Sequence, residues 1–115
     1  MLNPQVLYAK EKLSNAVDIL ATHPGKIKAR LRVAALEIMF TPVATLPELG
    51  RINEDVRWIQ ESLTRREPNY EGQGKTNATL HRMRNKTAVE IAERIVDAEA
   101  KLDAHVRSNT ERISS

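Results

Sequence analysis

The chain has 115 residues, of which 41% are hydrophobic and 29% charged, with a formal net charge of +3. These proportions predict a single globular domain and exclude an intrinsically disordered chain. Cysteine is absent, which excludes a disulfide framework, a thiolate zinc site and a thiol nucleophile. Aromatic residues make up only 3%, so the core must come from Leu, Ile, Val and Ala, which favours helices packed on helices.

The first predicted helix begins at Asn3-Pro4, where a side-chain cap precedes a proline in the first turn. Apolar residues then recur at spacings of three and four, which predicts one core-facing side. The helix is expected to end at 22–25, because Pro24 fits the first turn of a following helix but not a helix interior. The core-facing residues are Val6, Ala9, Leu13, Ala16 and Leu20.

The second predicted helix covers about 24–40 and carries apolar residues on two sides. One side holds Ile27, Leu31, Ala34 and Ile38, and the nearly opposite side holds Val33, Leu36 and Phe40. A helix with two apolar sides is typical of the centre of a bundle or of a subunit interface. We therefore predict a homo-oligomer, with the second side in its interface.

A capping box at Thr45-Leu46-Pro47-Glu48 predicts the start of the third helix. Trp58 lies off the core-facing side of this helix, where an indole either closes the edge of the core or anchors a partner. The sequence leaves both roles open, and we include Trp58 among the candidate interface residues. The core-facing residues are Leu49, Ile52, Val56, Ile59 and Leu63.

A basic loop is expected over 65–77, followed by a short helix from about Asn77 to Asn85 that Thr76 or Asn77 caps. A second capping box, Thr87-Ala88-Val89-Glu90, predicts the start of a last long helix, whose polar end at about 108–115 is expected to fray. The predicted fold is an all-α helical bundle of four long helices plus one short helix, in a single domain over 1–115.

Positive charge is concentrated in two segments of the chain. Residues 65–86 contain six Lys or Arg and two acids, and residues 26–32 contain four bases and no acid. Ten of the 18 bases therefore lie in these segments, which leaves eight elsewhere against thirteen of the 15 acids. Local positive charge of this kind indicates an anionic partner.

The segment Gly72-Gln73-Gly74-Lys75-Thr76 invites comparison with the phosphate-binding P-loop. That motif requires a glycine where Asn69 stands and a strand before the loop, so we exclude it. A weaker anion site remains, because glycines expose backbone N–H groups and a helix start offers a positive dipole end. The alternative is a solvated loop beside a basic helix. The candidate ligand-binding residues are Lys28, Arg32, Tyr70, Gly72, Gly74, Lys75, Thr76, Arg82, Arg84 and Lys86.

Nucleic acid is an alternative partner. A helix-turn-helix interpretation takes the third helix as the recognition helix, with Arg51, Asn53 and Arg57 as base readers. Glu54 and Asp55 oppose it, because their carboxylates would face the phosphates. A third alternative is a purely structural or protein-interaction module.

Catalysis is poorly supported by the sequence. The three histidines, His23, His81 and His105, are far apart, and no serine has the sequence context of a nucleophile elbow. We therefore expect no catalytic residue, metal ion or cofactor. The first residues lack a basic segment followed by an apolar run, and no apolar stretch approaches the roughly 20 residues of a membrane span, so we expect a cytoplasmic protein without a membrane partner.

Three segments, Gly25 to Leu31, Leu46 to Leu49, and Glu71 to Ile95, resemble a group of uncharacterised short helical proteins from bacterial genomes and prophages. The resemblance implies a setting in phage–host or mobile-element biology and transfers no activity or site residue. Our prediction is a non-enzymatic protein that binds an anionic ligand, with a nucleotide or a nucleotide-derived signal sequestered by a phage-type protein as its sharpest form.

Overall fold

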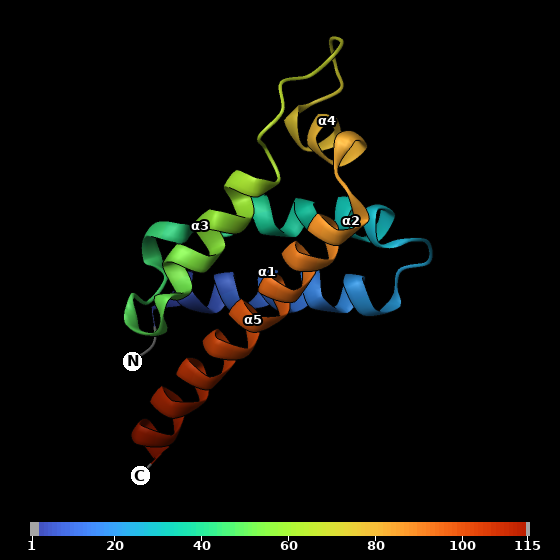
Figure 1. Cartoon of the computed structure of the whole chain (residues 1–115). Coiled ribbons are helices and arrows are strands. Elements are labelled where there is room, and N and C mark those ends of the chain that lie inside the picture. The colour runs from blue at the N-terminus through green and yellow to red at the C-terminus, as the bar shows by residue number, and fades with distance from the viewer. Residues whose placement is uncertain (1–2, 115) are drawn as a thin grey trace.

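A computed structural model describes residues 3–114, except for the side chains of Leu49 and residues 110–114. Within this range the fold is all-helical, as predicted, and contains no strand. Figure 1 shows the helices in chain order. They are α1 (Pro4–Thr22), α2 (Ile27–Met39), the 3₁₀ turns η1 (Val43–Thr45) and η2 (Leu49–Arg51), α3 (Ile52–Ser62), α4 (Lys75–Arg82) and α5 (Asn85–Ser114).

Helix α1 begins and ends as its sequence predicts. The Asn3 side chain accepts a hydrogen bond of 2.9 Å from the backbone N–H of Gln5, and Pro4 occupies the first turn. The expected core-facing residues are buried. At the other end, Arg30 donates a 2.9 Å hydrogen bond to the carbonyl of Leu20, which satisfies an acceptor in the last turn of α1.

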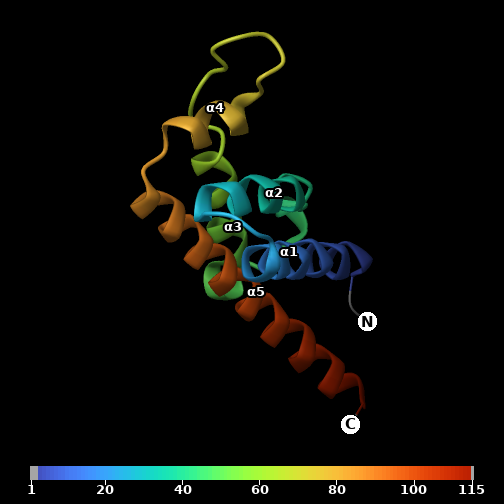
Figure 2. The same ribbon diagram turned by 90° about the vertical axis from the view of Figure 1, so that its right-hand side faces the viewer.

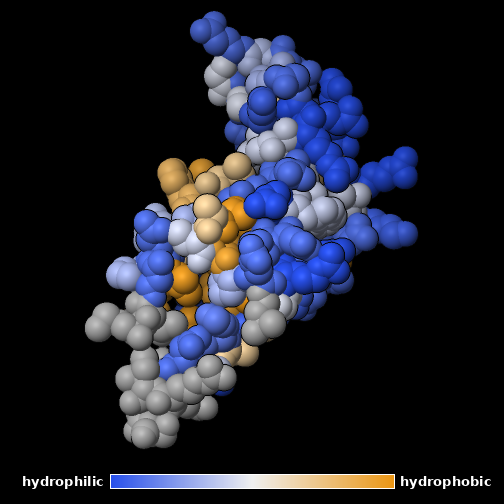
Figure 3. Space-filling view, turned by 90° about the vertical axis from the view of Figure 1, so that its left-hand side faces the viewer, coloured by the Kyte–Doolittle hydropathy of each residue, from blue (hydrophilic) through white to orange (hydrophobic). Residues whose placement is uncertain are grey.

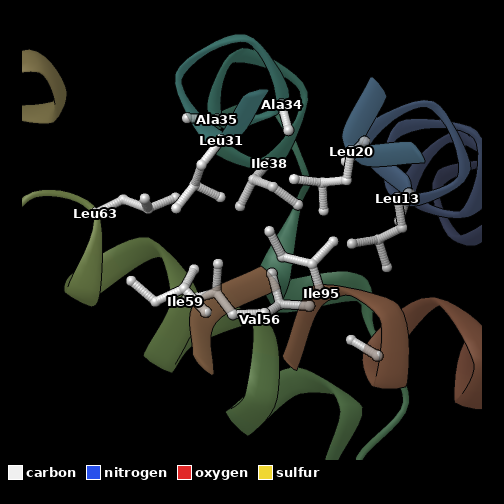
Figure 4. Close-up of a cluster of buried hydrophobic side chains, with 14 of the residues drawn as sticks. Leu13, Leu20, Leu31, Ala34, Ala35, Ile38, Val56, Ile59, Leu63 and Ile95 are labelled. Atoms are coloured by element: carbon white, nitrogen blue, oxygen red, sulfur yellow. The ribbon is translucent and has the colours of Figure 1, made fainter. Parts of the chain in front are cut away.

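The core lies where α1 and α2 meet α3 and α5 (Figures 1 and 2). Each of these four helices contributes the side predicted from its apolar spacing, as Figure 4 shows for ten labelled residues. These are Leu13, Leu20, Leu31, Ala34, Ala35, Ile38, Val56, Ile59, Leu63 and Ile95. Leu49, which the sequence also assigns to the core, has a side chain outside the described part of the chain.

The third helix starts later than predicted, at Ile52 rather than at the capping box near residue 45. The Thr45 hydroxyl donates to the Pro42 carbonyl at 2.9 Å instead of capping a helix. Gly50 and Arg51 then take positive φ values of 80° and 63°, which break the chain direction before α3. The residues from 40 to 51 therefore form a longer connection with two 3₁₀ turns, unlike the short turn of a helix-turn-helix.

The boundaries of the last two helices also differ from the prediction. Helix α4 starts at Lys75 with Gly74 as its cap, so neither Thr76 nor Asn77 caps it. Helix α5 starts at Asn85, which places Thr87 inside the first turn rather than at the predicted cap. It continues to Ser114, through most of the segment expected to fray, and residue 115 lies outside the described range.

The described chain is elongated, with principal extents of 54 × 26 × 20 Å. Figures 1 and 2 show the reason, because the C-terminal half of α5 runs beyond the other helices and α4 lies at the opposite end. None of the helices between residues 3 and 114 has the length and apolar character needed to cross a bilayer.

Candidate anion-binding site

The residues between α3 and α4 fold back on α4 and form one unit with it, which we call the loop–α4 lobe (residues 64–83). The backbone N–H of Asn69 donates to the Gln73 side chain at 2.6 Å, and the Asn77 side chain donates to the Gln73 carbonyl at 3.0 Å. The Gln73 side chain is buried despite its polarity. The loop is therefore held in place by specific hydrogen bonds, and its residues from 65 to 72 are exposed.

A second set of contacts fixes the start of this loop. The backbone N–H of Arg66 donates to the Thr79 hydroxyl at 2.9 Å, and the Arg82 guanidinium donates to the Asn69 side chain at 3.1 Å. Thr79 is 5% exposed, so its hydroxyl is a buried anchor for the segment that leaves α3. These contacts place the arginines at 65 and 66 beside α4.

The lobe is attached to the rest of the protein through α2. Leu80 joins the main core, and Ala78 is buried next to it in the same helix. The Lys28 ammonium donates to the carbonyl oxygens of Met83 at 2.9 Å and His81 at 3.4 Å. A cation at these carbonyls also interacts favourably with the negative end of the α4 dipole.

A hollow of about 450 Å³ opens between the lobe and the helices α3 and α5. Four of the residues around it are arginines, and only one is an acid. We call it the arginine hollow. Its lining residues are Trp58, Ser62, Arg65, Arg66, Thr79, Arg82, Met83, Arg84, Thr87 and Glu90.

Helices α3 and α5, which both contribute residues to this hollow, run antiparallel to each other, as Figure 1 shows. Lys101 of α5 donates to Asp55 of α3 at 2.8 Å. Trp58 lies one turn after Asp55 on α3, and the Arg94 guanidinium of α5 lies over its ring, 4.7 Å from the centroid. One more turn along each helix leads to Ser62 on α3 and Glu90 on α5. The lining of the hollow therefore combines an indole, a hydroxyl and an exposed carboxylate.

Two features of the hollow suit a ligand. Ser62 is 4% exposed, and its hydroxyl has no hydrogen-bond partner among the described residues. A buried hydroxyl without a partner costs free energy that a bound ligand would recover. The guanidinium groups of Arg65 and Arg84 are exposed and make no hydrogen bond or ion pair within residues 3–114, so both are available to an anion.

The comparisons with known proteins give no relative. No family model, curated protein or solved structure matches the chain. The candidate site is therefore defined by the burial, charge and hydrogen bonding of its own residues.

The structure divides the predicted ligand-binding residues into separate places. Arg82 and Arg84 line the arginine hollow. Lys75 instead forms an ion pair of 3.6 Å with Glu67, and Tyr70 is 66% exposed on the loop. Gly72 and Gly74 have positive φ values that shape the loop, and neither lines the hollow. Lys86 is also exposed and lies outside the lining.

The basic start of α2 has mainly contacts within the fold. Lys28 and Arg30 donate to carbonyls at the ends of α4 and α1, so their charges are used inside this chain. Arg32 and Thr76 line a smaller hollow of about 280 Å³ between α2 and α4, together with the apolar Leu36 and Met39. Neither Lys28 nor Arg32 is among the lining residues of the arginine hollow.

Seven lining residues belong to neither the predicted ligand-binding set nor the candidate interface set: Ser62, Arg65, Arg66, Thr79, Met83, Thr87 and Glu90. Arg65 and Arg66 belong to the basic segment 65–86, so the number of basic residues in this segment was a signal from which they could have been predicted. Ser62, Thr79 and Glu90 carry no comparable signal in the sequence. Their positions in the hollow depend on how α3, α4 and α5 meet.

The candidate interface residues differ in exposure. Leu36 and Phe40 are 65% and 66% exposed, whereas Val33 and Trp58 are half-buried. Figure 3 shows apolar atoms gathered on the side of the molecule where α2 ends, below the polar surface of the loop–α4 lobe. Among the described residues, no group of three His, Asp or Glu side chains is arranged as a metal site.

Proposed function

We propose that this protein is a non-enzymatic binding protein for an anionic ligand with phosphate groups, held in the arginine hollow. The observation that carries the proposal is the convergence of four arginines on a hollow that also contains the unpartnered Ser62 hydroxyl. Guanidinium groups bind phosphate oxygens in a planar, bidentate geometry. Because the arginines are exposed, binding weakens as the salt concentration rises.

The size and lining of the hollow favour a nucleotide over a single phosphate ion. A volume of about 450 Å³ is in the range of ordinary small-molecule sites. Trp58 and Met83 give the hollow an apolar wall, which suits an aromatic ring. A nucleotide combines such a ring with phosphates. The resemblance to prophage proteins supports a role in which the protein sequesters a nucleotide-derived signal of its host.

The proposal is tested with the double variant Arg65→Ala/Arg84→Ala, which removes two exposed guanidinium groups that make no hydrogen bond or ion pair among the described residues. Pyrophosphate and nucleoside diphosphates should raise the melting temperature of the wild-type protein, because they bind the folded state. The double variant should lose most of this shift and keep the melting temperature of the unliganded protein.

The matched control is Lys26→Ala/Arg57→Ala, which removes the same charge from exposed positions outside the hollow. This control should keep the ligand-induced shift. Equal loss in both double variants would show a general charge effect and contradict the assignment of the hollow.

Nucleic acid is the alternative ligand, and the same basic surface supports it. A duplex that contacts several phosphates would show a steep fall of affinity with salt, and a mononucleotide a shallow one. The connection from 40 to 51 separates α2 from α3 by more than a helix-turn-helix allows, so this alternative relies on charge alone.

We also propose that the chain forms a homo-oligomer through the end of α2. The support is the exposure of Leu36 and Phe40, which are large apolar side chains on neighbouring turns of one element. Exposed apolar side chains that gather on one face are typical of a subunit contact. A proposed oligomer of this kind leaves the arginine hollow open, because Leu36 and Phe40 are not among its lining residues.

A further inference from the structure

Charged groups of both signs line the arginine hollow. Three of its four arginines come from the loop–α4 lobe, and Arg84 comes from the link to α5. Glu90 comes from α5 and is the only carboxylate in the lining. It forms no ion pair with any arginine in the described chain, so its two oxygens remain available as acceptors.

We infer that the ligand is a guanine nucleotide, with its phosphates on the arginines and its base against Glu90, Ser62 and Trp58. This inference rests on the proposed function, because it names the chemical class of the anion that the hollow binds. It adds a base-reading role for Glu90, a residue that otherwise only lowers the positive charge of the site.

The donor pattern of the base decides between the purines. Guanine presents two adjacent N–H donors, at N1 and N2, which match the two acceptor oxygens of an ionised carboxylate. Adenine presents one donor, at N6, beside the lone pair of N1, which repels a carboxylate. An acceptor-only group at this position therefore favours guanine and disfavours adenine.

Ser62 and Trp58 fit the same base. The unpartnered Ser62 hydroxyl lies one helical turn from Trp58, and Ser62 and Glu90 line the same hollow. It can donate to the O6 acceptor of guanine, next to the N1 donor that Glu90 accepts. The Trp58 indole lines the same hollow and offers apolar surface to the base ring.

The test measures binding of GDP, ADP, inosine diphosphate and pyrophosphate by titration calorimetry at one salt concentration. Wild-type protein should bind GDP at least about tenfold more tightly than ADP, the ratio expected for hydrogen bonds to a charged group. Inosine diphosphate lacks the N2 amino group and should lie between them. The Glu90→Gln variant should lose the preference for GDP and keep its affinity for pyrophosphate.

The matched control is Glu93→Gln, which removes a carboxylate one turn further along α5 and outside the arginine hollow. It should keep the preference for GDP. Equal affinity of the wild-type protein for GDP and ADP would overturn the guanine assignment, and an unchanged preference in Glu90→Gln would overturn the role of Glu90. Both results leave the proposed anion site standing. Absence of binding by pyrophosphate and by all the nucleotides would instead contradict the anion site itself.

Discussion

The Thr79 hydroxyl accepts a 2.9 Å hydrogen bond from the backbone N–H of Arg66 and donates one of 2.7 Å to the carbonyl of Lys75. A single buried side chain on α4 thus fixes the segment that carries two of the arginines of the hollow. We expect Thr79 to affect ligand binding by positioning Arg65 and Arg66 and not by contacting the ligand, because its hydroxyl already makes two hydrogen bonds within the fold. This relationship joins the stability of the lobe to the geometry of the site.

Replacing Thr79 with valine tests this link. Valine keeps the shape of the side chain but leaves the N–H of Arg66 without an acceptor, which should lower the free energy of unfolding by about 1 kcal/mol. Urea denaturation measures the change. Thr79→Ser retains the hydroxyl and should cost less, so equal losses in the two variants would contradict a hydrogen-bonding role.

The ion pair between Lys75 and Glu67 predicts a difference between two basic residues that the sequence treats alike. Arg84→Ala should weaken binding of a nucleoside diphosphate by about tenfold, the effect of one lost charge-assisted contact. Lys75→Ala should change it far less, because Lys75 lies outside the arginine hollow. Calorimetric titration of both variants measures the affinity. A larger loss of affinity in Lys75→Ala than in Arg84→Ala would indicate that the ligand binds at the glycine loop and not in the arginine hollow.

Gly74 caps α4 with φ 79° and ψ 154°, a combination that residues other than glycine rarely adopt. Gly74→Ala should therefore destabilise the lobe by about 1–3 kcal/mol through backbone strain. No atom lies within 4 Å of the added Cβ, so a clash does not contribute. Hydrogen exchange of the α4 amides measures the change. Gly50→Asn is a useful contrast, because φ 80° with ψ 2° is near a region that asparagine tolerates.

The pair Lys12–Glu37 predicts a pH dependence at alkaline pH. The hydrogen bond to Glu37 raises the pKa of Lys12 above its ordinary value of 10.5, against an opposing effect of burial, and the two groups lie 3.2 Å apart. Because the folded pKa is the higher one, the stabilisation is complete below pH 10.5 and is lost as the pH rises through the folded pKa.

The measurement is the difference in melting temperature between the wild-type protein and Glu37→Gln, followed from about pH 8 to 11. The wild-type advantage should be constant at first and then shrink above the ordinary pKa of lysine. A difference that stays constant over the whole range would show that the charge of Lys12 is not involved.

The exposed apolar residues at the end of α2 predict that self-association depends on Phe40. Phe40→Glu should lower the apparent mass in sedimentation equilibrium, because a carboxylate would be buried in the contact. Tyr70→Glu is the matched control, since Tyr70 is as exposed as Phe40 at 66% but lies on the loop. A wild-type protein that sediments as a monomer at all concentrations would contradict the proposed oligomer.

The sequence was sufficient for the parts of the fold that local patterns determine. The apolar side of α1 and its Asn3 cap require only neighbouring residues, and both predictions are confirmed. The predicted start of α3 was wrong. The chain turns at Gly50 and Arg51, which have positive φ values, so the helix begins after them and not at the capping box near Thr45. That outcome depends on how Leu46 and Ile52 enter the core, which no local pattern contains.

The candidate site was predictable in its charge and not in its geometry. The basic segment 65–86 indicated an anionic partner, and two of its predicted residues, Arg82 and Arg84, line the hollow. The glycines suggested a backbone cradle, but the structure uses their positive φ values to turn the loop. The hollow is assembled from α3, α4 and α5, so Ser62 and Glu90 become part of it only in the folded chain.

The division between core and lobe has a consequence for how this protein tolerates sequence change. Nearly all of the buried core comes from α1, α2, α3 and α5, and the loop–α4 lobe contributes Leu80. Substitutions of exposed residues in 64–77, other than the glycines with positive φ, therefore carry little risk for folding, because few core contacts depend on them. The exposed side chains of Arg65 and Arg66 can therefore be exchanged without loss of core packing, so the ligand preference of the hollow can be altered separately from the fold.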